Sequence, residues 1–145
     1  ALRAFGRLMR REELKSLTGN SYFILGLLSV ALVFPRPIVC LSILFLALGD
    51  PIAAIVGTRW GKHRIWRNKS IEGMAANFVV TALASLLAGI YLLASPTPFL
   101  LALVGGICSV IAEALPLKID DNLTIPVVSA SLLGAASLLL PLFVL

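Results

Sequence analysis

Five long apolar runs, separated by short polar segments, dominate the pattern of this chain. They cover residues 17–34, 38–57, 74–94, 99–115 and 123–140. Each run holds 17 to 21 residues, close to the length that an α-helix needs to cross the hydrocarbon core of a bilayer. Proline or polar residues follow the first four runs and end the helical pattern there. The pattern therefore predicts an all-α, polytopic integral membrane protein with about five transmembrane helices.

The composition supports the membrane class. Hydrophobic residues make up 59% of the chain and charged residues 13%, whereas soluble domains average near 45–50% apolar and about 25% charged. These values exclude a disordered chain and disfavour an ordinary soluble domain. Five spans use most of the 145 residues, so we expect one transmembrane catalytic domain, residues 17–145, after a short N-terminal segment.

The basic residues predict an orientation. Residues 1–16 form a basic, amphipathic segment with five Lys and Arg, and the loop over residues 58–73 holds five more. Five spans place both regions and Lys118 on one face, and only Arg36 on the other. The positive-inside rule makes the basic face cytoplasmic, so the N-terminus is inside. We therefore interpret the net charge of +5 as membrane topology, and expect no nucleic-acid partner.

The acidic residues indicate chemistry. Asp50 and Glu113 lie inside apolar runs, and Glu72, Asp120 and Asp121 lie at their ends. All five fall at or near the cytoplasmic face of the five-span topology. Ionisable residues at membrane depth are costly and usually functional. Carboxylates beside a basic loop are suited to Mg²⁺ shared with phosphates; the alternative is that Asp50 and Glu113 are structural partners of Lys or Arg.

The segment around Asp50 departs from a plain membrane span. Gly49, Asp50 and Pro51 interrupt the second run, and proline is expected to kink the helix there. Gly57 and Gly61 follow Asp50 at near-helical spacing. Small residues on one face admit a ligand or a second helix at close range, so a packing groove is the alternative to a binding site.

The loop over residues 58–73 has the composition of a phosphate-binding segment. Its cations can bind phosphate oxygens, although it lacks the spacing of a Walker P-loop. Lys69 and Ser70, followed by Glu72 and Gly73, favour more than attraction to anionic lipid, because such attraction needs no acid or glycine.

A third polar group precedes the last run. Asp121 or Asn122 can cap the last helix, with Pro126 in its first turn. Two adjacent acids exceed what one cap needs, which leaves Asp120 or Asp121 for a metal or a nucleotide. Asn20, at the start of the first run, either reaches the same site or marks the membrane interface.

Taken together, these motifs resemble the CTP-dependent lipid kinases: dolichol kinase, phytol kinase and CTP-dependent diacylglycerol kinase, which are related to phosphatidate cytidylyltransferase. The resemblance runs from Leu17 to about Ser131 and rests on the order and spacing of several motifs. They are Leu17–Phe23, Gly49-Asp50-Pro51, Gly57, Gly61-Lys62, Lys69-Ser70, Glu72-Gly73, Glu113 and Asp120–Pro126.

The resemblance implies an enzyme that transfers the γ-phosphoryl group of CTP to a long-chain lipid alcohol at the cytoplasmic face, with Mg²⁺ or Mn²⁺. The alcohol would be a polyprenol such as dolichol, phytol or diacylglycerol. Asp50, Glu113 and Asp121 would be catalytic and, with Asp120, would bind the metal. The expected CTP-binding residues are Asn20, Gly57, Gly61, Lys62, Lys69, Ser70, Glu72, Asn122 and Thr124.

Two other functions fit parts of the pattern. A CTP-dependent cytidylyltransferase acting on phosphatidate would need the same metal, nucleotide and lipid. An ion-coupled transporter subunit would need polar residues near the midplane, where these spans carry few. Many members of the family also begin with an Arg-Lys-x-x-His segment that this sequence lacks. Further helices or homo-oligomerisation are therefore expected to complete the lipid pocket.

Overall fold

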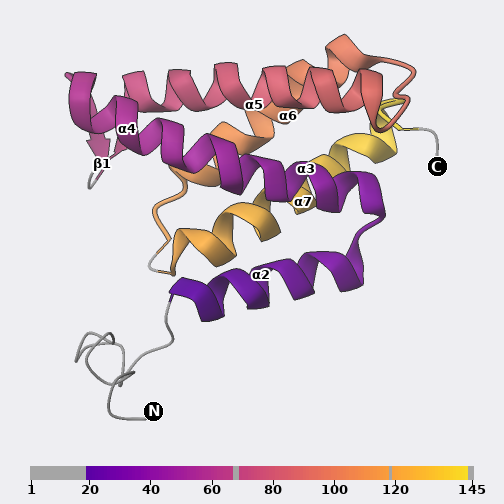
Figure 1. The fold of residues 1–145 in the computed structure, drawn as a ribbon, viewed down its shortest axis with the longest axis horizontal. Helices are drawn as coiled ribbons and strands as arrows, with labels where there is room; N and C mark the ends of the chain where they lie inside the picture. The colour runs from indigo at the N-terminus through magenta and orange to yellow at the C-terminus, as the bar shows by residue number, and fades with distance from the viewer. Residues whose placement is uncertain (1–18, 67–68, 118, 144–145) are drawn as a thin grey trace, which may run out of the picture.

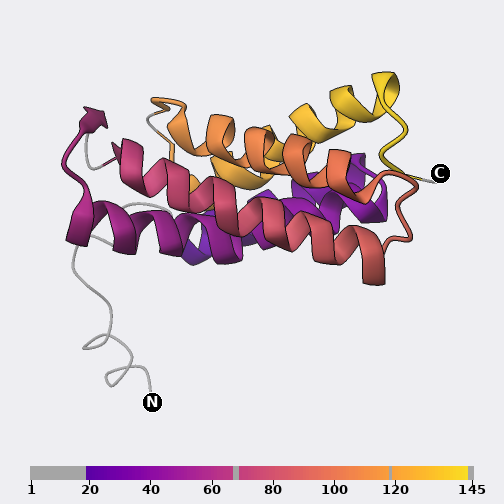
Figure 2. The ribbon, with the colours of Figure 1, turned by 90° about the horizontal axis from the view of Figure 1, so that it is seen from above.

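The structure is a computed structural model that describes residues 19–66, 69–117 and 119–143. Its helices lie along one common direction, so that their ends gather at the two ends of a bundle (Figures 1 and 2). They are α2 (Gly19–Val33), α3 (Arg36–Leu44), α4 (Asp50–Trp60), α5 (Ile71–Tyr91), α6 (Pro98–Ala114) and α7 (Asp121–Leu139). A π-helical turn, η1 (Phe45–Gly49), joins α3 to α4, and a hairpin of β1 (Arg64–Trp66) and β2 (Lys69–Ser70) joins α4 to α5.

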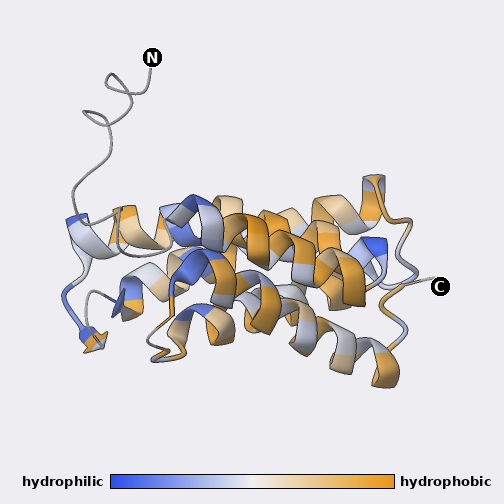
Figure 3. Cartoon of the chain, turned by 90° about the horizontal axis from the view of Figure 1, so that it is seen from below, coloured by the Kyte–Doolittle hydropathy of each residue, from blue (hydrophilic) through white to orange (hydrophobic). Residues whose placement is uncertain are grey.

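The prediction of a mostly helical membrane fold is confirmed. Among the described residues, three helical segments are long and apolar enough to cross a membrane: Arg36–Trp60, Ile71–Tyr91 and Asp121–Leu139. The apolar helices α2 and α6 are shorter. Figure 3 shows hydrophilic residues gathered at the end that holds the hairpin, called here the hairpin end, and apolar residues along most of the bundle.

The segment between the second and third runs differs from the predicted loop over residues 58–73. Helix α4 continues to Trp60, and α5 already begins at Ile71. The early start of α5 has a local cause: the Ser70 hydroxyl accepts a hydrogen bond from the Gly73 amide at 3.1 Å and caps the helix. The short antiparallel hairpin therefore makes the fold not purely α-helical. The predicted N-terminal segment, residues 1–16, lies outside the described residues.

Small residues let the long helices approach one another closely. A Cβ atom added at Gly106 of α6 would come within 2.8 Å of the Phe78 ring of α5, and one at Gly105 would collide with Ser85. The apolar core lies farther from the hairpin end and contains the fully buried Leu41, Phe45, Leu101, Ile125 and Leu133. Close packing of α5 on α6 keeps the polar hairpin end in a fixed arrangement.

Replacing Gly73 by alanine is expected to lower the free energy of unfolding by about 1–3 kcal/mol, despite the better helix propensity of alanine. The added Cβ would lie 2.7 Å from the carbonyl oxygen of Ala53, a backbone atom that can move only with its helix. Gly134→Ala is the matched control, because its Cβ would meet side chains rather than backbone: the ring of Phe34 at 3.0 Å and Ile38 Cδ1 at 3.9 Å. Thermal unfolding in detergent measures both, and an unchanged Tm for Gly73→Ala would contradict the expectation.

Candidate active site

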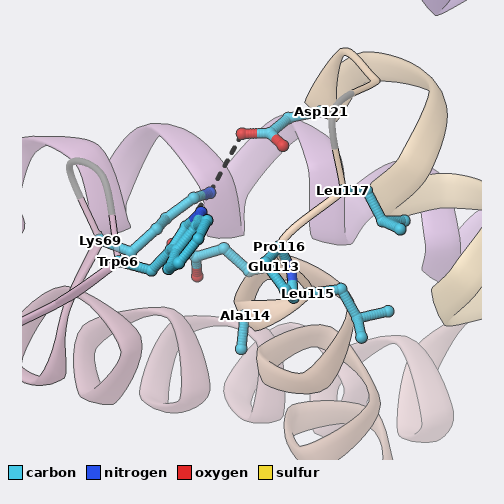
Figure 4. A pocket seen from close by; sticks show the side chains of 8 residues that line it. All are labelled: Trp66, Lys69, Glu113, Ala114, Leu115, Pro116, Leu117 and Asp121. Carbon is cyan, nitrogen blue, oxygen red and sulfur yellow. Dashed lines mark hydrogen bonds and ion pairs between the residues drawn. The ribbon is translucent and has the colours of Figure 1, made fainter.

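Three carboxylates from three helices surround the ammonium group of Lys69 at the hairpin end. The Lys69 Nζ atom lies 3.1 Å from Asp121 Oδ2, 3.6 Å from Glu113 Oε1 and 3.8 Å from Asp50 Oδ1. Figure 4 shows Lys69 reaching from the hairpin toward Asp121, with Glu113 beside it. The structure thus brings together four residues that the sequence singled out, called here the Lys69 cluster.

The charges in the Lys69 cluster are not balanced. Burial disfavours the ammonium form, but the hydrogen bond to Asp121 and the charges of Glu113, Asp121 and Asp50 outweigh it and raise the pKa of Lys69 above its ordinary value. Lys69 is therefore protonated at neutral pH. One ammonium group thus faces three carboxyl groups, so acidic groups outnumber basic ones in the cluster.

A π-helical turn precedes Asp50. The Asp50 amide donates to the Phe45 carbonyl across this turn, and turns of this kind often occur at functional sites. A Cβ at Gly49 would lie 2.8 Å from Thr81 Cγ2, so glycine lets the turn pack directly against α5. Pro51, predicted to kink the run, occupies the first turn of α4 immediately after the π-helical turn.

Glu113 is held by a buried polar network. Its Oε2 atom accepts a hydrogen bond from the side-chain amide of Asn77. The second polar side-chain atom of Asn77, Oδ1, accepts hydrogen bonds from Ser109 Oγ at 2.7 Å and from Thr81 Oγ1 at 3.3 Å. All four residues are buried. The sequence reasoning missed this network, although polar residues four apart on an apolar helix, as at Asn77, Thr81 and Ser85, were an available signal.

Replacing Asn77 by leucine is expected to destabilise the protein by about 1–3 kcal/mol, because Glu113 and Ser109 would lose a buried partner. Ser85→Ala is the control, since the Ser85 hydroxyl only donates to the Thr81 carbonyl of its own helix. Thermal unfolding of both variants in detergent tests the difference. Equal stability of Asn77→Leu and the unmodified chain would show that the network contributes nothing measurable.

The residues before α7 have a different arrangement from the predicted cap. Asp120, not Asp121 or Asn122, is the N-cap: its Oδ1 atom accepts from the Asn122 amide at 2.9 Å and from Asn122 Nδ2 at 2.8 Å. The reason is that Asp120 still has extended backbone, whereas Asp121 is the first helical residue. Asp121 is thereby free to face Lys69.

Glu72 lies away from the Lys69 cluster and fastens the hairpin to α5. Its carboxylate is 2.8 Å from His63 Nδ1 and accepts from the His63 backbone amide at 3.3 Å. This contact ties the end of α4 to the first turn of α5. It holds both ends of the segment that carries Lys69.

The other predicted CTP-binding residues lie in three different environments. Gly57 and Gly61 pack against neighbouring backbone and Ser70, where a Cβ at Gly61 would lie 2.7 Å from Ser70 Oγ. Lys62 and Asn20 are exposed, and Thr124 is buried within α7. Of the predicted CTP-binding residues, only Lys69 and Ser70 line the cavities that follow.

Two cavities adjoin the Lys69 cluster, and Lys69, Glu113 and Asp121 line both of them. The α4 cavity has a volume of about 270 Å³, and its further lining residues are Asp50, Ala53, Ala54, Thr58 and Ser70. The loop cavity has a volume of about 190 Å³, and its further lining residues are Trp66, Ala114, Leu115, Pro116 and Leu117. Figure 4 shows the loop cavity, with Trp66 beside Lys69.

The donor set of the Lys69 cluster fits a hard divalent cation, because carboxylate oxygens are the ligands that Mg²⁺ prefers. The cluster is not a ready-made metal cage, since the Lys69 ammonium lies between the carboxylates. Within residues 19–66, 69–117 and 119–143, no group of three or more His, Cys, Asp or Glu side chains has a metal-binding arrangement. The excess of carboxyl groups over ammonium groups is the feature that favours a cation.

Comparison with known proteins places this arrangement in context. No protein-family model matches the chain, and no solved structure matches it. The chain is 37% identical to CTP-dependent diacylglycerol kinase 1 of Schizosaccharomyces pombe, over 90% of this chain and 66% of that protein. It is 30% identical to CTP-dependent diacylglycerol kinase 1 of Saccharomyces cerevisiae, over 92% of this chain and 53% of that protein.

A plant protein that is named for another lipid substrate has the same percentage identity to this chain as the Schizosaccharomyces pombe protein. Farnesol kinase, chloroplastic, of Arabidopsis thaliana is 37% identical over 83% of this chain and 42% of that protein. The chain thus spans less than two thirds of the length of each of these three relatives. The matched region nevertheless covers 83–92% of this chain. The chain therefore belongs to the CTP-dependent lipid kinase family.

Proposed function

We propose that this chain carries the catalytic site of a CTP-dependent lipid kinase. The names of its relatives support a lipid alcohol as acceptor: diacylglycerol, farnesol and, for a protein of Schizosaccharomyces pombe, dolichol. The observation that carries the proposal is the Lys69 cluster, where one cation and three carboxylates from four separate elements converge. Phosphoryl transfer needs this kind of site, because it depends on positioning and on neutralising oxygen charge.

The residues of the cluster have complementary tasks in this reaction. The Lys69 ammonium binds the phosphate oxygens of CTP. One carboxylate accepts the proton of the lipid hydroxyl. The hydroxyl oxygen then forms a bond to the γ-phosphorus while the bond between that phosphorus and the β–γ bridging oxygen breaks. The products are a lipid phosphate and CDP.

A divalent cation is part of the proposal. Asp50, Glu113 and Asp121 would hold Mg²⁺ or Mn²⁺. Asp120, the fourth ligand expected from the sequence, caps α7 through its Oδ1 atom and would not be required. The bound ion would supply further neutralisation of phosphate charge. The hydrogen bond from Asn77 to Oε2 holds the Glu113 carboxylate with its Oε1 atom beside Lys69.

The orientation in the membrane is also proposed. Four of the five Lys and Arg residues in the described part of the chain lie at the hairpin end, namely Arg59, Lys62, Arg64 and Lys69. The positive-inside rule then puts the site at the cytoplasmic face and the N-terminus inside, with all five apolar helices in the membrane. Segments corresponding to the unmatched parts of the relatives, or a second copy of the chain, would complete the lipid pocket.

The proposal is tested with purified protein in detergent, Mg²⁺ and [γ-³²P]CTP, using diacylglycerol, farnesol, phytol and dolichol as acceptors. The expected result is a labelled lipid. A parallel reaction uses [α-³²P]CTP and phosphatidate. Label in lipid only from the α-position would overturn the kinase assignment in favour of a cytidylyltransferase, because that reaction transfers CMP and releases pyrophosphate.

A further inference from the structure

The two cavities beside the Lys69 cluster are lined by different elements of the fold. In the α4 cavity, Asp50, Ala54 and Thr58 fall four residues apart on one helix. At 1.5 Å per residue this cavity follows the axis of α4 for about 12 Å. Helix α4 belongs to the candidate membrane span Arg36–Trp60. The α4 cavity therefore follows the part of this span from Asp50, in the Lys69 cluster, to Thr58, near the hairpin end.

The flank of α4 beside this cavity is open. Ala54 and Thr58 are exposed, and Ile55 next to them is 49% exposed. In a bilayer such a surface on a spanning helix is in contact with acyl chains. The small side chains of Ala53 and Ala54 leave room for a lipid headgroup beside Asp50.

The loop cavity is lined largely by residues outside the helices. Trp66 belongs to β1, and Leu115, Pro116 and Leu117 belong to the connection between α6 and α7. None of these four residues lies within a helix. The loop cavity thus lies beside the ends of α6 and α7, and Lys69 of the hairpin reaches into its lining (Figure 4). Its exposed indole offers a face on which a nucleobase can stack.

We propose that the lipid alcohol reaches the Lys69 cluster through the α4 cavity and that CTP reaches it through the loop cavity. This assignment rests on the proposed kinase function and gives each substrate its own route. The two routes meet at Lys69, Glu113 and Asp121, which line both cavities. Two substrates that approach one set of residues from different sides satisfy the geometric need of a direct transfer.

The assignment also selects the proton acceptor. Asp50 lines the α4 cavity but not the loop cavity, so it faces the lipid hydroxyl. The hydroxyl proton moves to the Asp50 carboxylate as the oxygen bonds to the γ-phosphorus. The bond to the β–γ bridging oxygen breaks, and CDP leaves through the loop cavity.

Protection of single cysteines from maleimide labelling tests the two routes. The parent is Cys40→Ala, since Cys40 is exposed whereas Cys108 is buried. Thr58→Cys then reports on the α4 cavity and Leu117→Cys on the loop cavity. Ligand at ten times its Kd should slow labelling of an occluded site about tenfold. CTP with Mg²⁺ is expected to protect Leu117→Cys alone, and 1,2-dioctanoylglycerol or farnesol to protect Thr58→Cys alone.

Ala54→Cys and Leu115→Cys form a second pair, in case either first variant fails to fold. The reverse pattern, or protection of both sites by CTP, would overturn the assignment of routes. Transfer of label from [γ-³²P]CTP by the parent is measured in parallel. Transfer with the reverse pattern keeps the kinase and removes the routes, whereas the expected protection without transfer keeps the two binding sites and removes the kinase reaction.

Discussion

Lys69→Met is expected to lower kcat/KM for phosphorylation of a lipid alcohol by at least about 100-fold, the loss typical for a group that stabilises transition-state charge. Methionine has a similar length but no charge, so the phosphate oxygens lose their nearest cation. Asp50, Glu113 and Asp121 would then face one another without the ammonium group that now lies 3.1–3.8 Å from them. Initial rates with [γ-³²P]CTP measure the effect.

Two further substitutions make the Lys69 result interpretable. Lys69→Arg keeps the charge but changes its geometry, and should retain more activity than Lys69→Met. Arg36→Met removes an exposed cation at the opposite end of the bundle and should leave the rate within about twofold. Activity of Lys69→Met comparable to that of Arg36→Met would show that the cluster is a structural ion pair.

The helices could be predicted from the sequence because the patterns that mark them are local. Continuous apolar runs and the prolines or polar residues that follow them placed the outer ends of the five helical segments within three residues of their observed positions, with α3, η1 and α4 counted as one segment. The division of that segment at Leu44 and Asp50 was not predicted. The acids were located for the same reason, since a carboxylate in an apolar run is conspicuous. The convergence of Asp50, Glu113 and Asp121 at one end required only that successive spans alternate in direction.

The partners within the site depend on packing between distant segments, which no local pattern encodes. Lys62 and Lys69 belong to the same basic segment, but the hairpin brings Lys69 to the carboxylates whereas Lys62 is exposed. The π-helical turn before Asp50 has no compositional signal. The contact of Asn77 with Glu113 joins two helices through close packing that depends on glycine.

Asp50→Asn is expected to reduce kcat by a factor between about 100 and 10,000, the range associated with loss of a general base. Asparagine has nearly the same shape, so the π-helical turn and α4 should keep their structure, and Tm should change little. The amide accepts no proton from the lipid hydroxyl and adds no charge to the cluster. Rates at saturating CTP and lipid alcohol measure kcat, and thermal unfolding checks the fold.

Asp120→Asn is the matched control, because it makes the same chemical change at a residue that takes part in none of the ion pairs of the Lys69 cluster. Asparagine caps a helix as well as aspartate, so the contact with the Asn122 amide is retained, and we expect the rate to stay within about threefold. A loss equal to that of Asp50→Asn would mean that the second carboxylate oxygen of Asp120 also serves the site, as a metal ligand would. Full activity of Asp50→Asn would instead move the proton acceptor to Glu113 or Asp121, since these carboxylates also contact Lys69.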